Sequence, residues 1–332
     1  MAFKINMKKI SLKPTGKNNK LCYYVKTTMQ QYVPSFCLKR RYEALMAAYE
    51  TRRDRAEIDA RVDYYCQIFS ARALHEPQDL SSMPRSKNVY YRDFFEYARY
   101  FNPALSVCTL FGDNTQIGSC PSIVKSRPIA ANNQNDIVLN LDKVRHFTFL
   151  NDTKNFLDKK PTAIYRAANY QPHRIEFMKK YFGSDIVDCG DTSHNRSGVP
   201  DQWRVAPITL YEHLNWRYIM SLEGNDVASN LKWIMSSNSI AVMPKPKFET
   251  WFMEGRLIGG YHYIEIREDY SDLPEKLAYY NEHLEEAQAI IDHAHEWIDQ
   301  FMDQDREDTI SLLVLKRYFE LTHSNKKLFC WQ

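Results

Sequence analysis

Apolar residues recur with a helical period over the first long patterned segment of the chain, residues 39–69. Leu45 and Ala48, then Ile58 and Val62, follow one another at three- and four-residue spacing, which predicts a helix. The segment before it is basic and polar, so we expect little regular structure there. Elsewhere in the first half the pattern is shorter. It predicts an element near 21–26, a helix over 93–100 and strands over 105–110, 137–141 and 146–150.

In the second half, short apolar runs alternate with amphipathic segments. This alternation predicts an α/β fold with a parallel sheet. The polar, lysine-rich segment 151–161 is the best candidate for a linker, so we predict two domains, residues 1–155 and 156–332. The expected strands are 162–165, 186–188, 218–222, 240–243 and 263–266, and the expected helices are 172–182, 209–215, 227–235, 248–253, 273–301 and 308–321.

The charge is distributed unevenly between these halves. The chain has 332 residues and a formal net charge of +3, and this length suits about two domains. Residues 1–155 carry 24 Lys+Arg against 14 Asp+Glu, a net +10, whereas residues 156–332 carry 20 against 27, a net −7. Such asymmetry predicts domains that face different partners. The acidic excess lies in residues 268–308, with 14 acids and two cations, which we interpret as solvated helices.

Several classes of protein are excluded. The sequence contains no run of about 20 apolar residues, the length that a membrane-spanning helix needs. The basic N-terminus lacks the apolar region of a signal peptide. With seven scattered cysteines, we expect reduced thiols and a cytoplasmic protein. Dinucleotide, P-loop, nucleophile-elbow and HExxH motifs are missing. Asp303-Gln304-Asp305 and the pair His293 and His295 lie in the acidic helical region, and we predict no metal site from them.

The strongest candidate for a binding site is the segment 223–232, which follows the expected strand 218–222 and opens an expected helix at Val227. Small and polar residues at such a junction expose backbone N–H groups that can bind a diphosphate. The alternative is a structural helix capped by Asn225 or Asp226. The residues of interest are Gly224, Val227, Ala228, Ser229, Asn230 and Lys232.

Three further positions combine charge with a strand end. Lys125 and Arg127, separated by a serine and followed by proline, could bind an anion or form a solvated basic turn. Arg166 ends an expected strand at the sheet edge where ligands bind, followed by Asn169 and with Pro172 and Arg174 behind the motif, or it pairs with a nearby carboxylate. Asp113 lies on a turn after a strand, as a general base or merely as a turn residue.

Taken in order, these motifs resemble glycosyltransferase family 90, over roughly residues 60–320. The family includes capsule-associated proteins, bacterial lipopolysaccharide core transferases and protein O-glucosyltransferases, and the upstream motifs fit the bacterial branch. The residues that carry the resemblance are Gly224–Lys232, Ser239-Ile240, Phe248–Phe252, His262-Tyr263 and Ser271–Leu273, with Phe111–Asp113, Lys125–Pro128, Arg145–Phe147 and Tyr165-Arg166 upstream.

The resemblance implies a GT-B architecture, with two Rossmann-like domains and a cleft between them. It implies an inverting hexosyltransferase that needs no metal and no cofactor, with UDP-glucose or UDP-galactose as co-substrate and Asp113 as general base. Asn169 and Asn230 depart from the animal enzymes, which have arginine at both places. The implied donor contacts are Lys125, Arg127, Arg166, Asn169, Gly224, Val227, Ala228, Ser229, Asn230, Lys232 and Glu249.

For the bacterial branch, the implied acceptor is a lipid-linked oligosaccharide of the lipopolysaccharide core at the inner leaflet. The basic half suits such an anionic surface, so we expect peripheral association with the inner membrane. Two alternatives stay open: a transferase for capsule or another surface glycan, and a non-catalytic module that binds sugar nucleotides. A nucleic-acid partner is not expected, because the sequence has no recognisable motif for one.

Overall fold

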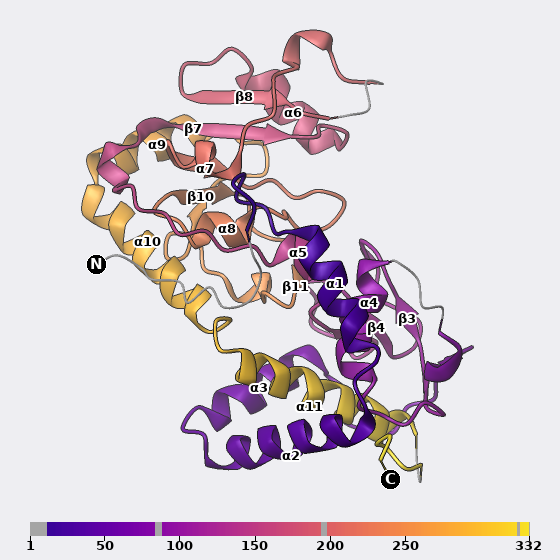
Figure 1. The fold of residues 1–332 in the computed structure, drawn as a ribbon. Coiled ribbons are helices and arrows are strands. Elements are labelled where there is room, and N and C mark those ends of the chain that lie inside the picture. The colour runs from indigo at the N-terminus through magenta and orange to yellow at the C-terminus, as the bar shows by residue number, and fades with distance from the viewer. Residues whose placement is uncertain (1–11, 84–87, 194–197, 324–325, 332) are drawn as a thin grey trace. The chain divides into compact units, whose positions relative to one another are not determined.

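The computed structural model describes residues 12–83, 88–193, 198–323 and 326–331 (Figure 1). The chain divides into two compact units. The five-strand unit contains 145–247 and 254–302 with the described part of 1–19, and the helical unit contains the described parts of 20–144, 248–253 and 303–332. The division thus differs from the expected single boundary at residue 155. It differs because the chain returns to the helical unit twice, to pair a strand and to pack its last long helix.

The five-strand unit is built on one parallel sheet with strand order β12-β10-β9-β7-β8. In chain order this is 2-1-3-4-5 read from the β8 edge, a doubly wound arrangement in which the direction of winding reverses between β7 and β9. The expected α/β fold with parallel strands is confirmed. The strands are β7 (Lys160–Ala167), β8 (Val187–Asp191), β9 (Trp216–Met220), β10 (Ile240–Met243) and β12 (Ile264–Glu265).

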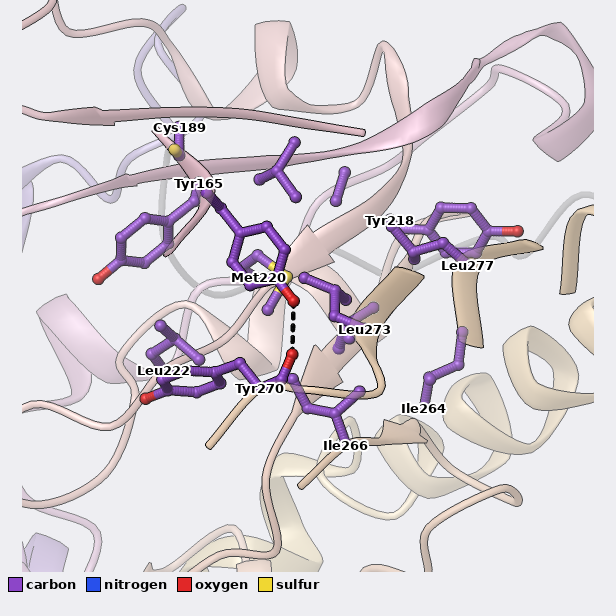
Figure 2. Close-up of a cluster of buried hydrophobic side chains, with 14 of the residues drawn as sticks. Tyr165, Cys189, Tyr218, Met220, Leu222, Ile264, Ile266, Tyr270, Leu273 and Leu277 are labelled. Carbon is purple, nitrogen blue, oxygen red and sulfur yellow. Dashed lines mark hydrogen bonds between the residues drawn. The ribbon is translucent and has the colours of Figure 1, made fainter. Parts of the chain in front are cut away.

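Buried side chains from the strands and covering helices form the core of this unit (Figure 2). All four residues of β10 and four of the five in β9 are buried, as expected of parallel strands covered on both faces. The Tyr181 hydroxyl donates a hydrogen bond of 2.5 Å to the Tyr270 carbonyl, inside the core. The helices of the unit are α6 (Pro172–Tyr181), α7 (Leu210–His213), α8 (Leu231–Met235), α9 (Leu273–Glu282) and α10 (Leu284–Asp299).

The helical unit combines helices with small sheets, and α5 (Lys143–His146) marks the passage to the other unit. Its helices are α1 (Lys20–Gln30), α2 (Ser35–Thr51), α3 (Arg55–Tyr65), α4 (Val89–Ala98) and α11 (Gln304–Thr322). A parallel sheet has the order β3-β4-β6, and antiparallel pairs join β1 to β2 and β5 to β11. These strands are β1 (Gln78–Asp79), β2 (Ser106–Val107), β3 (Thr109–Leu110), β4 (Ser122–Val124), β5 (Ser126–Pro128), β6 (Asp136–Val138) and β11 (Phe248–Thr250).

A buried ion pair joins three segments of the helical unit. Arg61 on α3 lies 2.5 Å from Glu307 on α11, and the indole nitrogen of Trp251 donates to the other oxygen of Glu307 at 2.6 Å. Trp251 also stacks on Tyr65, with ring centroids 3.9 Å apart. These contacts explain why the segment 248–253 belongs to this unit.

Five of the expected elements were wrong in type or extent. The expected helix 39–69 is two helices, because the chain is extended at Arg52. The expected strand 146–150 lies outside any strand, and the expected helix 248–253 begins as β11, which gains its hydrogen bonds from β5. The expected helix 227–235 begins only at Leu231. The long segment 273–301 is divided into α9 and α10 at His283.

Candidate active site

The carboxyl ends of β7 and β9 bring together two of the loops singled out in the sequence. The chain leaves β7 through Ala168 and Asn169, and it leaves β9 through the segment 221–230. Strands β7 and β9 are parallel neighbours, so both loops lie at one edge of the sheet. In open α/β sheets, ligands bind at this edge where the winding direction reverses. We call the place between these loops the switch-point edge.

Asn169 is buried within a hydrogen-bond network that joins the ends of β7 and β8. Its side-chain oxygen accepts from the Tyr165 hydroxyl at 2.9 Å. Its backbone and side-chain nitrogens donate to Asp191 at 3.0 and 3.1 Å. The Ser193 hydroxyl donates to the second oxygen of Asp191 at 2.6 Å. Asn169 therefore fixes the loop through buried hydrogen bonds, and its amide is not exposed to solvent.

Arg174, which was not among the predicted donor contacts, holds both loops. Its guanidinium donates to the carbonyls of Leu222 and Glu223, each at 2.8 Å, and to the carbonyl of Ala168 at 2.9 Å. It is in the first turn of α6, where a cation opposes the helix dipole. The sequence motif placed Arg174 behind the strand end without giving it a contact, and its place two residues after Pro172 in the first turn of a helix is the signal that could have assigned one.

The segment 224–230 is a loop and not the first turn of a helix. The prediction that a helix N-terminus at Val227 faces the diphosphate is wrong, because α8 begins only at Leu231 and has five residues. Asn230 ties the loop to β9: its amide donates to the Met220 carbonyl at 2.9 Å and accepts from the Ser221 hydroxyl at 3.0 Å. Val227 and Ala228 are buried, whereas Asn225 and Ser229 are exposed. Asn225 accepts from the Gln171 amide at 3.1 Å, and Ser229 is a loop hydroxyl that a ligand could reach.

Two predicted donor contacts are engaged in ion pairs within the five-strand unit. Lys232 is fully buried, and its ammonium lies 2.5 Å from Glu254, which is buried too. Arg166 lies 2.6 Å from the Asp188 carboxylate and donates to the Asp188 carbonyl at 2.7 Å. The pairing alternative for Arg166 thus describes the structure. A direct contact of Lys232 with a diphosphate stays a prediction, and it requires the Glu254 pair to open.

In the helical unit, the structure brings Asp113 and Lys125 together. Asp113 follows β3 and Lys125 follows β4, and these strands are parallel neighbours. The Lys125 ammonium lies 2.6 Å from the Asp113 carboxylate, with 1% of the lysine side chain exposed and 27% of the aspartate. An adjacent ammonium favours the ionised carboxylate, the form that accepts a proton from a hydroxyl. The arrangement is therefore suited to a positioned base.

Arg127 and Glu249, both predicted donor contacts, are paired with each other. They face one another across the β5–β11 pair and approach to 2.7 Å. Arg127 also donates to the carbonyls of Asp136 at 3.0 Å and Tyr64 at 2.8 Å, and the Tyr64 hydroxyl contacts Glu249. Arg127 is wholly buried, so it is neither a solvated turn residue nor an exposed anion contact.

The acidic motif near the C-terminus has a structural role. Asp303 precedes α11, accepts from the Arg306 backbone N–H at 3.1 Å and lies 2.7 Å from Arg52. Nowhere in the described ranges do three or more His, Cys, Asp or Glu side chains gather as metal ligands would. None of the described helices combines the length and apolarity needed to cross a bilayer.

Comparison with known proteins identifies the class. The family model for glycosyl transferase family 90 matches residues 141–328, and the chain belongs to this family. It is 40% identical over 307 residues to the O-glucosyltransferase LpsA of Dichelobacter nodosus, a match that covers 91% of this chain and 96% of that protein. The resemblance seen in the sequence motifs is thereby confirmed, and the chain is a glycosyltransferase.

Proposed function

We propose that the protein is an inverting glucosyltransferase that uses UDP-glucose and acts on the lipopolysaccharide core. The observation that carries the proposal is the switch-point edge, where Arg174 and Asn230 fix two loops at the place where parallel α/β sheets bind ligands. The name of the relative, an O-glucosyltransferase, favours glucose over galactose. The acceptor is an expectation from the bacterial branch of the family.

The proposed reaction is a single displacement at the anomeric carbon. Asp113 accepts the proton of the acceptor hydroxyl, that oxygen bonds to the anomeric carbon, and the bond from that carbon to UDP breaks. The electron pair leaves with UDP, and the configuration inverts. The Ser229 hydroxyl is proposed to donate to the diphosphate, whose negative charge grows as the bond breaks. Lys125 holds the Asp113 carboxylate in place at 2.6 Å.

The test is a UDP-release assay with several UDP-sugars on truncated core oligosaccharides, joined with NMR of the product. We expect release with UDP-glucose at least about tenfold faster than with UDP-galactose, and a β-linked product from the α-linked donor. Turnover only on capsule-type acceptors would show that the acceptor is another surface glycan and not the lipopolysaccharide core. Tight UDP-glucose binding without release on any acceptor would make it a binding module and overturn the proposal.

A further inference from the structure

The outward face of α1 is apolar. On its inner side the helix packs against α4 (Figure 1): the Tyr23 hydroxyl donates to Asp93 at 2.9 Å, and Arg92 donates to Thr27 at 2.9 Å. The opposite side carries Leu21, Val25 and Met29, at the four-residue spacing that aligns side chains along one helix face. A helix at the surface of a globular protein ordinarily places polar residues there, so this face requires an explanation.

Exposed apolar residues also follow the end of α1 in the chain. Tyr32 is 78% exposed, Val33 37% and Phe36, in the first turn of α2, 71%. We call Leu21, Val25, Met29, Tyr32, Val33 and Phe36 the apolar row. The row holds six of the 17 large hydrophobic residues that are exposed in the described parts of the chain. Exposed apolar side chains concentrated in this way mark an interaction surface, whereas scattered single ones do not.

Cations accompany the apolar row along the chain. The first 42 residues of the sequence contain ten Lys+Arg and no Asp or Glu. Lys20, Lys26, Lys39 and Arg40 are all exposed in or beside α1 and α2. Lys26 lies 3.7 Å from Glu96 and Lys39 lies 3.8 Å from Glu43, but both lysines are exposed, so these pairs contribute little. An apolar helix face flanked by lysines is the pattern of a helix that lies in a membrane interface, where acyl chains meet the apolar side chains and anionic headgroups meet the cations.

A cavity adjoins the row at Val33. Its volume is about 280 Å³, and it reaches the surface at Val33 and Ser35, both of which are exposed. Its walls are mainly apolar and include Leu38, Tyr91 and Phe94. An acyl chain of a membrane lipid could contact these apolar walls. The cavity is therefore consistent with a lipid surface next to the apolar row.

We infer that the apolar row and its flanking cations form the docking surface for an anionic lipid bilayer. This deepens the proposed function, on which it rests for the lipid-linked acceptor that would lie in the same membrane. Charge complementarity favours lipid over a second copy of the chain. A two-fold interface through this surface would bring identical cations together, and like charges at an interface are unfavourable.

The test is sedimentation of the full chain with vesicles of phosphatidylglycerol and phosphatidylethanolamine in equal parts, compared with neutral phosphatidylcholine vesicles. We expect binding to the anionic vesicles and weakening as salt rises from about 0.1 M to about 1 M, which shortens the screening length from about 10 Å to about 3 Å. The variant V25S/M29S/F36S should bind at least about tenfold more weakly. The matched control F69S/L157S/I258S removes three equally exposed apolar residues elsewhere and should bind normally.

Activity separates this inference from the proposed function. On a delipidated, water-soluble core acceptor, V25S/M29S/F36S should keep the turnover of the wild type, because none of these three residues is proposed to bind the donor or to take part in the reaction. If the wild type transfers no sugar yet its vesicle binding depends on the row, docking stands and the proposed function fails. Full vesicle binding by the triple variant overturns the inference. So does a wild-type dimer, seen by light scattering, that dissociates in the variant and binds no vesicles.

Discussion

The ammonium of Lys125 lies 2.6 Å from the carboxylate of Asp113, across the ends of two neighbouring parallel strands. The lysine is buried and the aspartate is partly exposed. The ion pair therefore orients the carboxylate from the protein side and leaves it within reach of solvent. A base that must meet an acceptor hydroxyl has the same requirement.

Replacing Asp113 by asparagine tests the role of this carboxylate. Asp113→Asn should lower turnover by about 10²- to 10⁴-fold, the usual contribution of a general base, with little change in the KM for UDP-glucose. Asp63→Asn is the control, because Asp63 is also an ion-paired carboxylate of the helical unit, bound to Arg317. Near-normal turnover of Asp113→Asn, with the fold intact by circular dichroism, would exclude Asp113 as the base.

The pair formed by Arg127 and Glu249 predicts a loss of stability. Glu249→Gln leaves a buried guanidinium without its counter-charge, and breaking such a pair costs about 3–5 kcal/mol of unfolding free energy. Denaturant unfolding would measure this. Glu268→Gln, which breaks an exposed pair with Lys247, should change stability by less than about 1 kcal/mol. A raised KM for the donor without loss of stability would instead make Glu249 a donor contact, as the sequence predicted.

Replacing Ser229 tests whether the loop 224–230 binds the diphosphate of the donor. Ser229→Ala should raise the KM for UDP-glucose about tenfold, because a hydrogen bond to a charged group contributes about 1.5 kcal/mol or more. Stability should not change, since the side chain is exposed. Ser70→Ala, another exposed serine, is the matched control. Equal donor KM values for both variants would remove Ser229 from the site.

Burial of Asp93 predicts a pH dependence of stability. Burial raises the pKa of Asp93 from 3.8 to about 7, although Lys143 opposes the shift. Between these values the folded protein holds a proton that the unfolded chain has released, so stability falls as pH rises. The loss is at most about 1.4 kcal/mol per pH unit between roughly pH 4 and pH 7.

The comparison with Asp93→Asn isolates this effect from other titrating groups. The difference in unfolding free energy between wild type and variant should shift steadily against the wild type from pH 4 to pH 7 and then level off. A difference that stays constant over this range would mean that Asp93 ionises in the folded state at its ordinary pKa.

Removal of metal ions should leave the enzyme active. The proposed chemistry stabilises the departing diphosphate with protein hydrogen-bond donors. We therefore expect turnover within about twofold of the untreated enzyme after exhaustive treatment with EDTA. A loss of activity that is restored by Mg²⁺ or Mn²⁺ would show that a metal carries that charge.

The sequence predicted the parts of the fold that depend on local pattern. The strand and helix alternation after residue 160 matches β7 to β10 with shifts of a few residues, because side-chain periodicity records burial along each element. It also placed Asp113 and Lys125 at strand ends. It failed at 248–253, where an apolar run with no clear period became β11 only by pairing with β5, some 120 residues earlier in the chain.

By itself, then, the sequence determined the α/β class, the family and the segments that reach the sheet edges. Only the tertiary structure decided which charges meet. It put Arg127 against Glu249 and Lys232 against Glu254, and it gave Arg174 the carbonyls of two loops. Local periodicity shows that a side chain is buried but not what it is buried against. The partner of a buried charge is set by segments far apart in the chain, and that partner determines whether the charge can serve a ligand.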